Sequence, residues 1–494
     1  MDFLDPKKKR AHNIRLYVGY ALTAVALGMS TLVLVFAAYG YSIDRNTGDV
    51  IQNGLLIIDA HPESATIFVD GKSQGTTDSR LILPAGKYKL ELQRQGYRSW
   101  THSVNLEGSS IEQLVYPILF PSNLVSKTIQ QYSAVPAMAS ESPDRHWFVV
   151  QQPNSTSSFD VVDLSTTKNA VTPISLPADT FNPAAGVHTY EAVEWSTDNA
   201  HLLLKHIFAG GSEFIMLDRG DPVASVNLNK VFTGQSFTSV TLRDKKADQL
   251  YLLNNADGGL LQADIKSRAT TPVQTKVLSY KSYQSNTLLY VTASAKDTSQ
   301  VEVRVREGDK DYLLRNLPIA GSYLLEMAQF NGHFYLVSGS TADGRAYVYK
   351  DVLDELGDHP ANAPKPFRVL VVAGAQYVSF SAIARFVAVQ GGSNFTVYDF
   401  ETNRQSRYDT KLPLAANQKA SWMDGHRLSL VSEGFVNIFD FDGTNNQKLS
   451  TSFPAFTPFF DRDYTAMFTL NVSADKTNIT RTELKVLPPG QSGQ

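Results

Sequence analysis

Hydrophobic and polar positions divide the chain into one long apolar run and a succession of short alternating segments. The run covers residues 16–41, which are 26 consecutive residues without a charged side chain. At 1.5 Å per residue a helix of this length measures about 39 Å, against a hydrocarbon core of about 30 Å. A soluble helix normally carries a polar face, and this run has none. The pattern therefore predicts a transmembrane helix over residues 16–41.

The charges that flank the apolar run predict its orientation. Basic residues precede it, at Lys7, Lys8, Lys9, Arg10 and Arg15, whereas Arg45 after it is opposed by Asp44 and Asp49. A basic excess in a short flank marks the cytoplasmic side, so we expect residues 1–15 to form a cytoplasmic tail that contacts anionic lipid. The remaining chain would be extracytoplasmic, held at the plasma membrane by a single pass.

A cleaved signal peptide is the alternative interpretation of the same segment. Its apolar run would measure about 7–15 residues, much less than here, although Ala38-Tyr39-Gly40 resembles a weak cleavage site. The length favours a retained anchor, and cleavage remains the second possibility.

Short strands begin after a polar spacer predicted over residues 42–54. Apolar and polar residues alternate with a period of two, and turn residues such as Asp70-Gly71 separate the segments. We expect strands at residues 55–60, 66–70, 80–83, 88–92, 100–106 and 111–118. With no helical pattern between them, these strands predict a small β-sandwich.

Residues 55–120 resemble the PEGA domain. The family's Pro-Glu-Gly-Ala turn stands here as Pro62-Glu63-Ser64-Ala65, with serine in place of glycine. The rest of the pattern agrees, with Val69-Asp70-Gly71-Lys72, Gly75-Thr76-Thr77, Leu83-Pro84-Ala85-Gly86-Lys87-Tyr88 and Gly96-Tyr97. The resemblance implies a small extracytoplasmic β module without catalytic residues. Tyr88, Tyr97 and Trp100 are accordingly expected in its core or edge rather than at a ligand.

Residues 124–487 repeat a pattern of a polar turn, an apolar strand, a second turn and an alternating strand. The strand pairs are predicted at residues 147–150 and 159–164, 201–205 and 214–218, 249–253 and 260–265, 288–292 and 301–305, 334–338 and 346–349, 385–389 and 395–400, 427–431 and 436–441, and 465–470 and 480–487. A repeat of about 40–50 residues is the size of a β-propeller blade. We therefore predict a propeller of eight blades, with seven as the alternative, closed by pairing of residues 124–133 with the last unit.

Two of these units also carry a family signature. Ser142-Pro143-Asp144-Arg145-His146-Trp147 and Trp195-Ser196-Thr197-Asp198-Asn199 are similar to the turns of TolB-type and other WD-repeat-like propellers. The insertion at residues 353–367 is rich in proline and is expected to be a loop between blades, and residues 488–494 a flexible tail.

Composition narrows the possible functions. The 494 residues are 43% hydrophobic and carry a net charge of −3, while the first fifteen residues are basic. The outer part is therefore mildly acidic, which argues against a nucleic-acid partner. The chain has no cysteine, so disulfides, thiolate metal sites and cysteine nucleophiles are excluded.

No linear motif predicts a catalytic, cofactor or metal site. The zinc, serine-hydrolase, phosphate-loop and dinucleotide signatures are all missing. The ten histidines are scattered, and His201 and His206 should point to opposite faces of one strand. Asp440-Phe441-Asp442-Gly443-Thr444-Asn445-Asn446 resembles a calcium loop, but Thr451 stands where the twelfth-position glutamate belongs, so a turn is favoured.

Two functions follow. The first is a non-catalytic, membrane-anchored surface protein whose extracytoplasmic propeller binds a protein or glycan of the cell envelope, or has a structural role there. The second is an exported propeller hydrolase or lyase whose side chains converge on the channel from several blades. Three or more Asp, Glu, His or Arg residues gathered on one propeller face would favour the enzyme.

Overall fold

The computed structural model describes residues 6–43, 48–254, 256–284, 286–358, 363–473 and 476–486. The predicted tail at 488–494 and parts of the predicted cytoplasmic tail and spacer lie outside these residues. The chain divides into two compact units, Met1–Asn123 and Leu124–Gln494. Each unit is described by itself.

The first unit begins with a long helix, α1 (Pro6–Ala38). It ends three residues before the predicted boundary at residue 41, because Gly40 adopts a left-handed conformation with φ of 74°. The Gly40 N–H donates to the Ala37 carbonyl at 3.0 Å, which satisfies one of the helix's last carbonyls. Tyr41 then starts β1 (Tyr41–Ile43), with its ring 4.9 Å from that of Phe36.

The end of the helix is hydrogen-bonded directly to the β-sandwich, so the predicted spacer is wrong. The Asn53 N–H donates to the Gly40 carbonyl at 2.7 Å, and the Gln52 amide donates to the Tyr39 carbonyl at 3.2 Å. Residues 42–43 belong to β1 and residues 50–54 to β2 (Val50–Ile58), whereas residues 44–47 lie outside the described part. The polarity of this stretch serves these hydrogen bonds rather than a free linker.

The sandwich contains two four-stranded sheets. In one, β2 pairs with β1, with β5 (Ser79–Pro84) and, in parallel, with β8 (Ile111–Leu114); the other has the order β4-β3-β6-β7, with β3 (Thr66–Val69), β4 (Lys72–Thr76), β6 (Gly86–Gln93) and β7 (Trp100–Leu106). Leu56, Ile58, Leu90, Leu92 and Trp100 are buried between them. The predicted strands are present, with β1 and β4 in addition.

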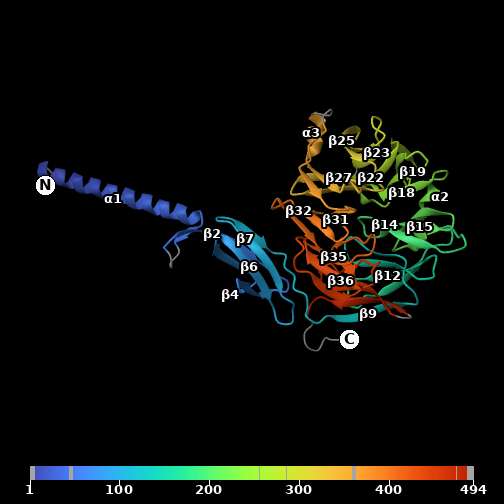
Figure 1. Cartoon of the computed structure of the whole chain (residues 1–494), viewed down its shortest axis with the longest axis horizontal. Helices are drawn as coiled ribbons and strands as arrows, with labels where there is room; N and C mark the ends of the chain where they lie inside the picture. The colour runs from blue at the N-terminus through green and yellow to red at the C-terminus, as the bar shows by residue number, and fades with distance from the viewer. Residues whose placement is uncertain are drawn as a thin grey trace. The chain divides into compact units, whose positions relative to one another are not determined.

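The second unit is a β-propeller. Its described residues form eight four-stranded antiparallel sheets, which follow one another around a ring (Figure 1). Sheets 1 to 4 are β10 (Ala139–Glu141), β11 (Trp147–Gln151), β12 (Ser158–Asp163) and β13 (Val171–Ser175); β14 (Thr189–Trp195), β15 (His201–Phe208), β16 (Gly211–Asp218) and β17 (Val226–Asn227); β18 (Phe237–Leu242), β19 (Gln249–Asn254), β20 (Leu260–Asp264) and β21 (Thr270–Gln274); and β22 (Val277–Tyr283), β23 (Thr287–Ala293), β24 (Gln300–Glu307) and β25 (Lys310–Pro318).

Sheets 5 to 8 repeat this arrangement. They are β26 (Tyr323–Phe330), β27 (His333–Ser340), β28 (Arg345–Lys350) and β29 (Arg368–Val371); β30 (Tyr377–Phe380), β31 (Phe386–Gly391), β32 (Asn394–Asp399) and β33 (Arg404–Asp409); β34 (Ser421–Trp422), β35 (Arg427–Ser432), β36 (Phe435–Asp440) and β37 (Gln447–Thr451); and β38 (Phe459–Phe460), β39 (Ala466–Ser473), β40 (Lys476–Glu483) and β9 (Val125–Tyr132). Short helices η1 (Pro222–Ala224), α2 (Leu228–Val231) and η2 (Arg243–Lys245) join strands of sheets 2 and 3.

The ring is closed by the first strand of this unit. β9 pairs antiparallel with β40 over its full length, from Val125 opposite Glu483 to Tyr132 opposite Thr477, and so becomes the fourth strand of sheet 8. This is the pairing expected for residues 124–133. The seam buries Phe148 and Val150 of sheet 1 against Phe468 and other residues of sheet 8.

Both faces of the central strands are buried, because each sheet packs against two neighbours. The apolar cluster of Val149, Phe159, Leu202 and Leu204, for example, joins sheets 1 and 2. In the sequence, strands buried on both faces appear as continuous apolar runs. All eight predicted strand pairs are present, as the second and third strands of the sheets. The last predicted strand, 480–487, lies four residues earlier, at β40.

A short helix replaces part of the predicted insertion loop. α3 (Val352–Asp358) lies between the third and fourth strands of sheet 5, not between blades. Val352 and Leu356, four residues apart, point to one side and are buried in the core shared by sheets 4 and 5. Residues 359–362 of this insertion lie outside the described part of the chain.

The turn that departs from the PEGA pattern gives a stability prediction. Ser64 has a φ of 61°, a conformation that costs a non-glycine residue roughly 1–2 kcal/mol. Glycine avoids this cost but gains roughly 0.5–1 kcal/mol of unfolded-state entropy. We expect Ser64→Gly to raise the unfolding free energy of the first unit by about 0.5–1 kcal/mol.

Calorimetry of the full-length protein in detergent measures this effect. Ser73→Gly in the exposed strand β4 is the matched control, and it should lower the same transition. Equal destabilisation by both variants would contradict the strain at Ser64.

Candidate functional site

The turns that follow the first strands of four sheets share one geometry, and we call them the inner turns. They cover residues 142–147, 196–201, 381–386 and 461–466. In each, the first N–H donates to the carbonyl five residues later, and the fourth residue has a positive φ. A Ser or Asp oxygen at the first position accepts the sixth residue's N–H, as Ser142 does from Trp147 at 3.0 Å. Ser196, Ser381 and Asp461 do the same in the other turns.

Residues at the left-handed position of the inner turns contact other sheets of the propeller. Arg145, with a φ of 59°, donates to the Met423 carbonyl of sheet 7 at 2.5 Å. Its guanidinium lies 4.7 Å from the ring centre of Tyr464, which occupies the same position of the turn in sheet 8. Asn199 accepts from the Asp144 N–H of sheet 1 at 3.3 Å. These turns therefore connect sheets that are distant in sequence.

Four ionisable groups converge beside the seam of the ring. Glu141, the last residue of β10, accepts from the Phe460 N–H of β38 at 3.1 Å, and its carboxyl is near Arg145, Asp461 and Asp144. Burial raises the pKa of Glu141 to about 8, and the two acids add to this, whereas Arg145 and the Phe460 N–H oppose it. The carboxyl is therefore largely protonated at neutral pH and is suited to donate a hydrogen bond or a proton.

Two of the four groups are occupied by their own turns. Asp144 accepts from the Ser142 hydroxyl and from the His146 N–H. Asp461 accepts from the Thr465 N–H at 2.6 Å and from its hydroxyl. Glu141 and Arg145 are left as the groups of this cluster that could act on a ligand. The Nη1 of Arg145 is buried without a hydrogen-bond partner.

The predicted calcium-like loop is a turn stabilised by its own side chains. Asp442 accepts from the Thr444 N–H at 3.0 Å, and Asp440 accepts from the Asn445 amide at 2.8 Å. The Arg427 guanidinium is 3.4 Å from Asp440, so a positive charge already lies beside that carboxylate. Throughout the described residues, no group of three or more His, Asp or Glu side chains is arranged to hold a metal ion.

The two histidines on β15 point to opposite faces, as predicted. His206 is fully buried and lies 2.8 Å from both His188 and Glu213. His201 is half-buried and lies 2.8 Å from Asp198. Burial raises the pKa of Glu213, but hydrogen bonds from His206, the Asn227 side chain and a backbone N–H outweigh it and hold the pKa below its usual value. Sequence reasoning missed this network, because His188 precedes β14 and Glu213 lies on β16.

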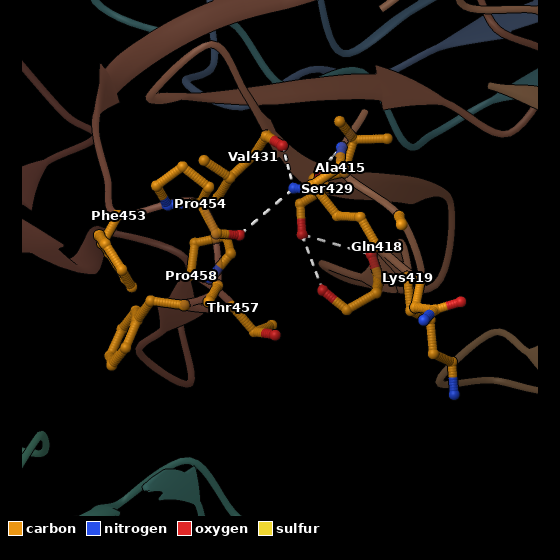
Figure 2. Close-up of a pocket in the computed structure, with 15 residues that line it drawn as sticks. Ala415, Gln418, Lys419, Ser429, Val431, Phe453, Pro454, Thr457 and Pro458 are labelled. Atoms are coloured by element: carbon orange, nitrogen blue, oxygen red, sulfur yellow. Dashed lines mark hydrogen bonds between the residues drawn. The ribbon is translucent and has the colours of Figure 1, made fainter. Parts of the chain in front are cut away.

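A cleft of about 450 Å³ lies between two loops that lead into β34 and β38 (Figure 2). Phe453, Pro454 and Val431 contribute apolar walls, and Ser429 and Thr457 contribute hydroxyl groups. The Gln418 amide donates to the carbonyls of Val431 and Pro454 and so holds the two walls together. Lys419 also belongs to the lining and is its one charged residue among those described, and its side chain extends away from the other labelled residues (Figure 2). No sequence motif indicated this cleft.

Comparison with known families identifies the β-sandwich. Residues 53–114 match the PEGA domain. The matched segment runs from Asn53 in β2 to the end of β8. Within the PEGA domain Trp100 is 2% exposed, and the Tyr88 hydroxyl donates to the Pro84 carbonyl at 2.7 Å. Both aromatic residues therefore have structural roles in the core and at its edge.

The propeller is similar to several solved structures at low identity. They include an oligogalacturonate lyase in complex with manganese (11% identity, TM-score 0.41, 72% of this chain and 98% of that chain). Another is the dihydro-heme d1 dehydrogenase NirN in complex with DHE (13% identity, TM-score 0.42, 80% of this chain and 74% of that chain). A third is the β-propeller domain of Cps50 (Swd1) from Myceliophteria thermophila (9% identity, TM-score 0.37, 72% of this chain and 99% of that chain). No curated protein matches the chain in sequence. At this level of similarity we transfer no activity.

The protonated Glu141 predicts a pH-dependent stability of the propeller. A carboxyl whose folded pKa is about 8, above its unfolded value, stabilises the fold below the unfolded pKa and loses this effect as the pH rises through 8. We expect the melting temperature to fall between pH 5 and pH 9. The unfolding free energy should decrease by at most about 1.4 kcal/mol per pH unit over this range.

Glu141→Gln should flatten this slope, because the amide keeps the acceptor for the Phe460 N–H and cannot ionise. Asp257→Asn, in a turn of sheet 3, is the matched control and should keep the wild-type slope. Thermal melts across this pH range test both, and an unchanged slope in Glu141→Gln would contradict a protonated carboxyl.

Proposed function

We propose that this chain is a single-pass membrane protein whose extracytoplasmic propeller is a non-catalytic binding module of the cell envelope. The observation that carries the proposal is α1. Among the described residues one helix is long and apolar enough to cross a membrane, over Lys9–Ala38, and that segment has no buried part. Such an exposed apolar helix needs a lipid environment.

The proposed order of domains follows from this anchor. Residues 1–15 are the cytoplasmic tail, residues 16–38 cross the membrane, the PEGA domain follows at the outer surface, and residues 124–487 form the propeller. The Tyr39 and Gly40 carbonyls accept hydrogen bonds from Gln52 and Asn53. These bonds support a PEGA domain held at the membrane surface.

The cleft beside Gln418 is the proposed binding site of the propeller. Its volume falls within the range of about 300–1,000 Å³ that is usual for ligand sites. Proline and phenylalanine walls lose little conformational entropy on binding, and the hydroxyl groups of Ser429 and Thr457 offer hydrogen bonds. A largely apolar segment of an envelope protein fits this chemistry, and a glycan is the second candidate.

An exported hydrolase or lyase is the alternative, and the convergence at Glu141 favours it. Glu141 as an acid and Arg145 as an anion-binding group would then act on the ligand. The hydrogen bonds of Glu141 to Phe460 and of Arg145 to Met423 favour a structural role for both residues. The binding module is therefore the better supported function.

The proposed topology predicts the accessibility of single cysteines. The natural sequence has no cysteine, so each introduced one reports a single position. In intact cells a membrane-impermeant maleimide should label Val223→Cys, an exposed position of the propeller, and should leave His12→Cys unlabelled until the cells are opened.

The same labelling separates an anchor from a signal peptide. If the chain that carries the propeller never acquires label at His12→Cys after lysis, the helix is cleaved. If Val223→Cys is labelled only after lysis, the proposed orientation is wrong.

The cleft predicts a position-dependent cross-link. A photoactivatable group on Thr457→Cys, at the rim of the cleft, should give a discrete adduct with one envelope component, whereas the same group on Val223→Cys should not. Ala416→Trp fills the cleft and should reduce the adduct at least about five-fold, which corresponds to about 1 kcal/mol of lost binding. Identical adducts from both positions would rule out the cleft as the binding site.

A further inference from the structure

One outer face of the PEGA domain is apolar. Leu55 in β2 pairs with Ile82 in β5 on one side and with Ile111 in β8 on the other, so the three side chains form a row across the sheet. We call them the apolar row. Ile82 is 71% exposed and Ile111 60% exposed. Adjacent exposed aliphatic side chains of this kind usually mark an interaction surface.

The opposite outer face of the same domain is polar. There Glu91 pairs with Thr101, Lys89 with Ser103 and Lys87 with Asn105, across β6 and β7. An antiparallel sheet that faces water on its outer side normally shows such polar residues. The two faces of one small module therefore differ, and the apolar row needs an explanation beyond general surface composition.

The apolar row lies close to the end of the membrane helix. The Asn53 N–H donates to the Gly40 carbonyl at 2.7 Å, and Leu55 is two residues further along β2, a distance of about 7 Å. The Ser109 hydroxyl donates to the Tyr39 carbonyl from the turn that precedes β8, which carries Ile111. The helix end and the strands of the row are thus joined on both sides of β2.

The length of the helix puts this junction at the membrane surface. The apolar part of α1, residues 16–38, measures about 35 Å, slightly more than a hydrocarbon core of about 30 Å. Tyr39 and Gly40 therefore emerge among the lipid headgroups. The strands bonded to them begin at that same depth.

We propose that the apolar row rests on the outer leaflet of the membrane that α1 crosses, with Ile82 and Ile111 inserted at the boundary between headgroups and acyl chains. The inference rests on the proposed membrane anchor. Arg80 and Gln113 flank Ile57 in the next row of the same face and provide donors for lipid phosphates. The PEGA domain is then a membrane-seated base rather than a spacer in solution.

Depth-dependent fluorescence quenching tests this contact on the full-length protein. The chain is reconstituted into phosphatidylcholine vesicles, with a polarity-sensitive fluorophore on one introduced cysteine. Ile82→Cys is the reporter, Ser73→Cys in the exposed strand β4 is the matched control, and Leu27→Cys reports on the middle of α1. Acyl chains brominated near the headgroup should quench Ile82→Cys at least about two-fold more than Ser73→Cys.

The outcomes separate this inference from the proposed function. If chains brominated near the bilayer centre quench Leu27→Cys, but lipids do not quench Ile82→Cys, the anchor stands and the membrane contact is wrong. If Leu27→Cys is not quenched either, the proposed anchor itself fails. A fluorophore on Ile82→Cys that is shielded from aqueous iodide but not quenched by lipid is covered by protein, which also overturns the inference. Ile111→Cys is the second reporter if Ile82→Cys does not fold.

Discussion

Closure of the ring by β9 is the constraint on which the propeller depends. Each sheet buries both faces of its central strands against two neighbours, so an open ring would expose one face of sheet 1 and one of sheet 8. Sheet 8 takes three strands from the end of the propeller sequence and its fourth, β9, from the beginning of that sequence. Ser126 of β9 and Thr482 of β40, which are 356 residues apart, are hydrogen-bonded across this pairing. The packing of Phe148 on Phe456 and Phe459 follows from that pairing.

Apolar patterning predicted the central strands well, because burial on both faces leaves an uninterrupted hydrophobic signal. β15 and β16 lie where residues 201–205 and 214–218 indicated. The outer strand β33 has the alternating exposure and composition of a polar loop, and the inner strand β34 has two residues, so neither was predicted. α3 was missed because its helical signal consists of Val352 and Leu356 alone. The sequence pattern does not predict residues 50–54 as strand, since a hydrogen bond to a helix end leaves no periodic pattern.

The candidate sites were beyond sequence reasoning for a different reason. Glu141 and Phe460 are 319 residues apart, and Arg145 and Met423 are 278 apart, so no local spacing relates them. The turns at Ser142 and Ser196 carry the Ser-x-Asp signature, whereas the turn at Ser381 has Ile383 at the third position and the turn at Asp461 has no serine at the first. What these turns share is an oxygen acceptor at the first position and a positive φ at the fourth residue. Of the fourth residues only Asn199 is of a type that readily adopts a positive φ, so local sequence does not mark the other three turns.

Arg145 and Tyr464 occupy turn positions where glycine would be unstrained. The contacts of the Arg145 side chain offset this strain. A left-handed conformation costs each roughly 1–2 kcal/mol. The contact of the guanidinium with the aromatic ring returns about 0.5–2 kcal/mol, and the hydrogen bond of a charged donor to the Met423 carbonyl about 1.5–3 kcal/mol. Both contacts connect sheets 1, 7 and 8, beside the strand pairing that closes the ring. A protonated Glu141 fits the same seam, because it accepts from Phe460 without bringing a further negative charge next to Asp144 and Asp461. The ionisable cluster at the seam is thus explained first by closure, and a ligand there would have to compete with these contacts.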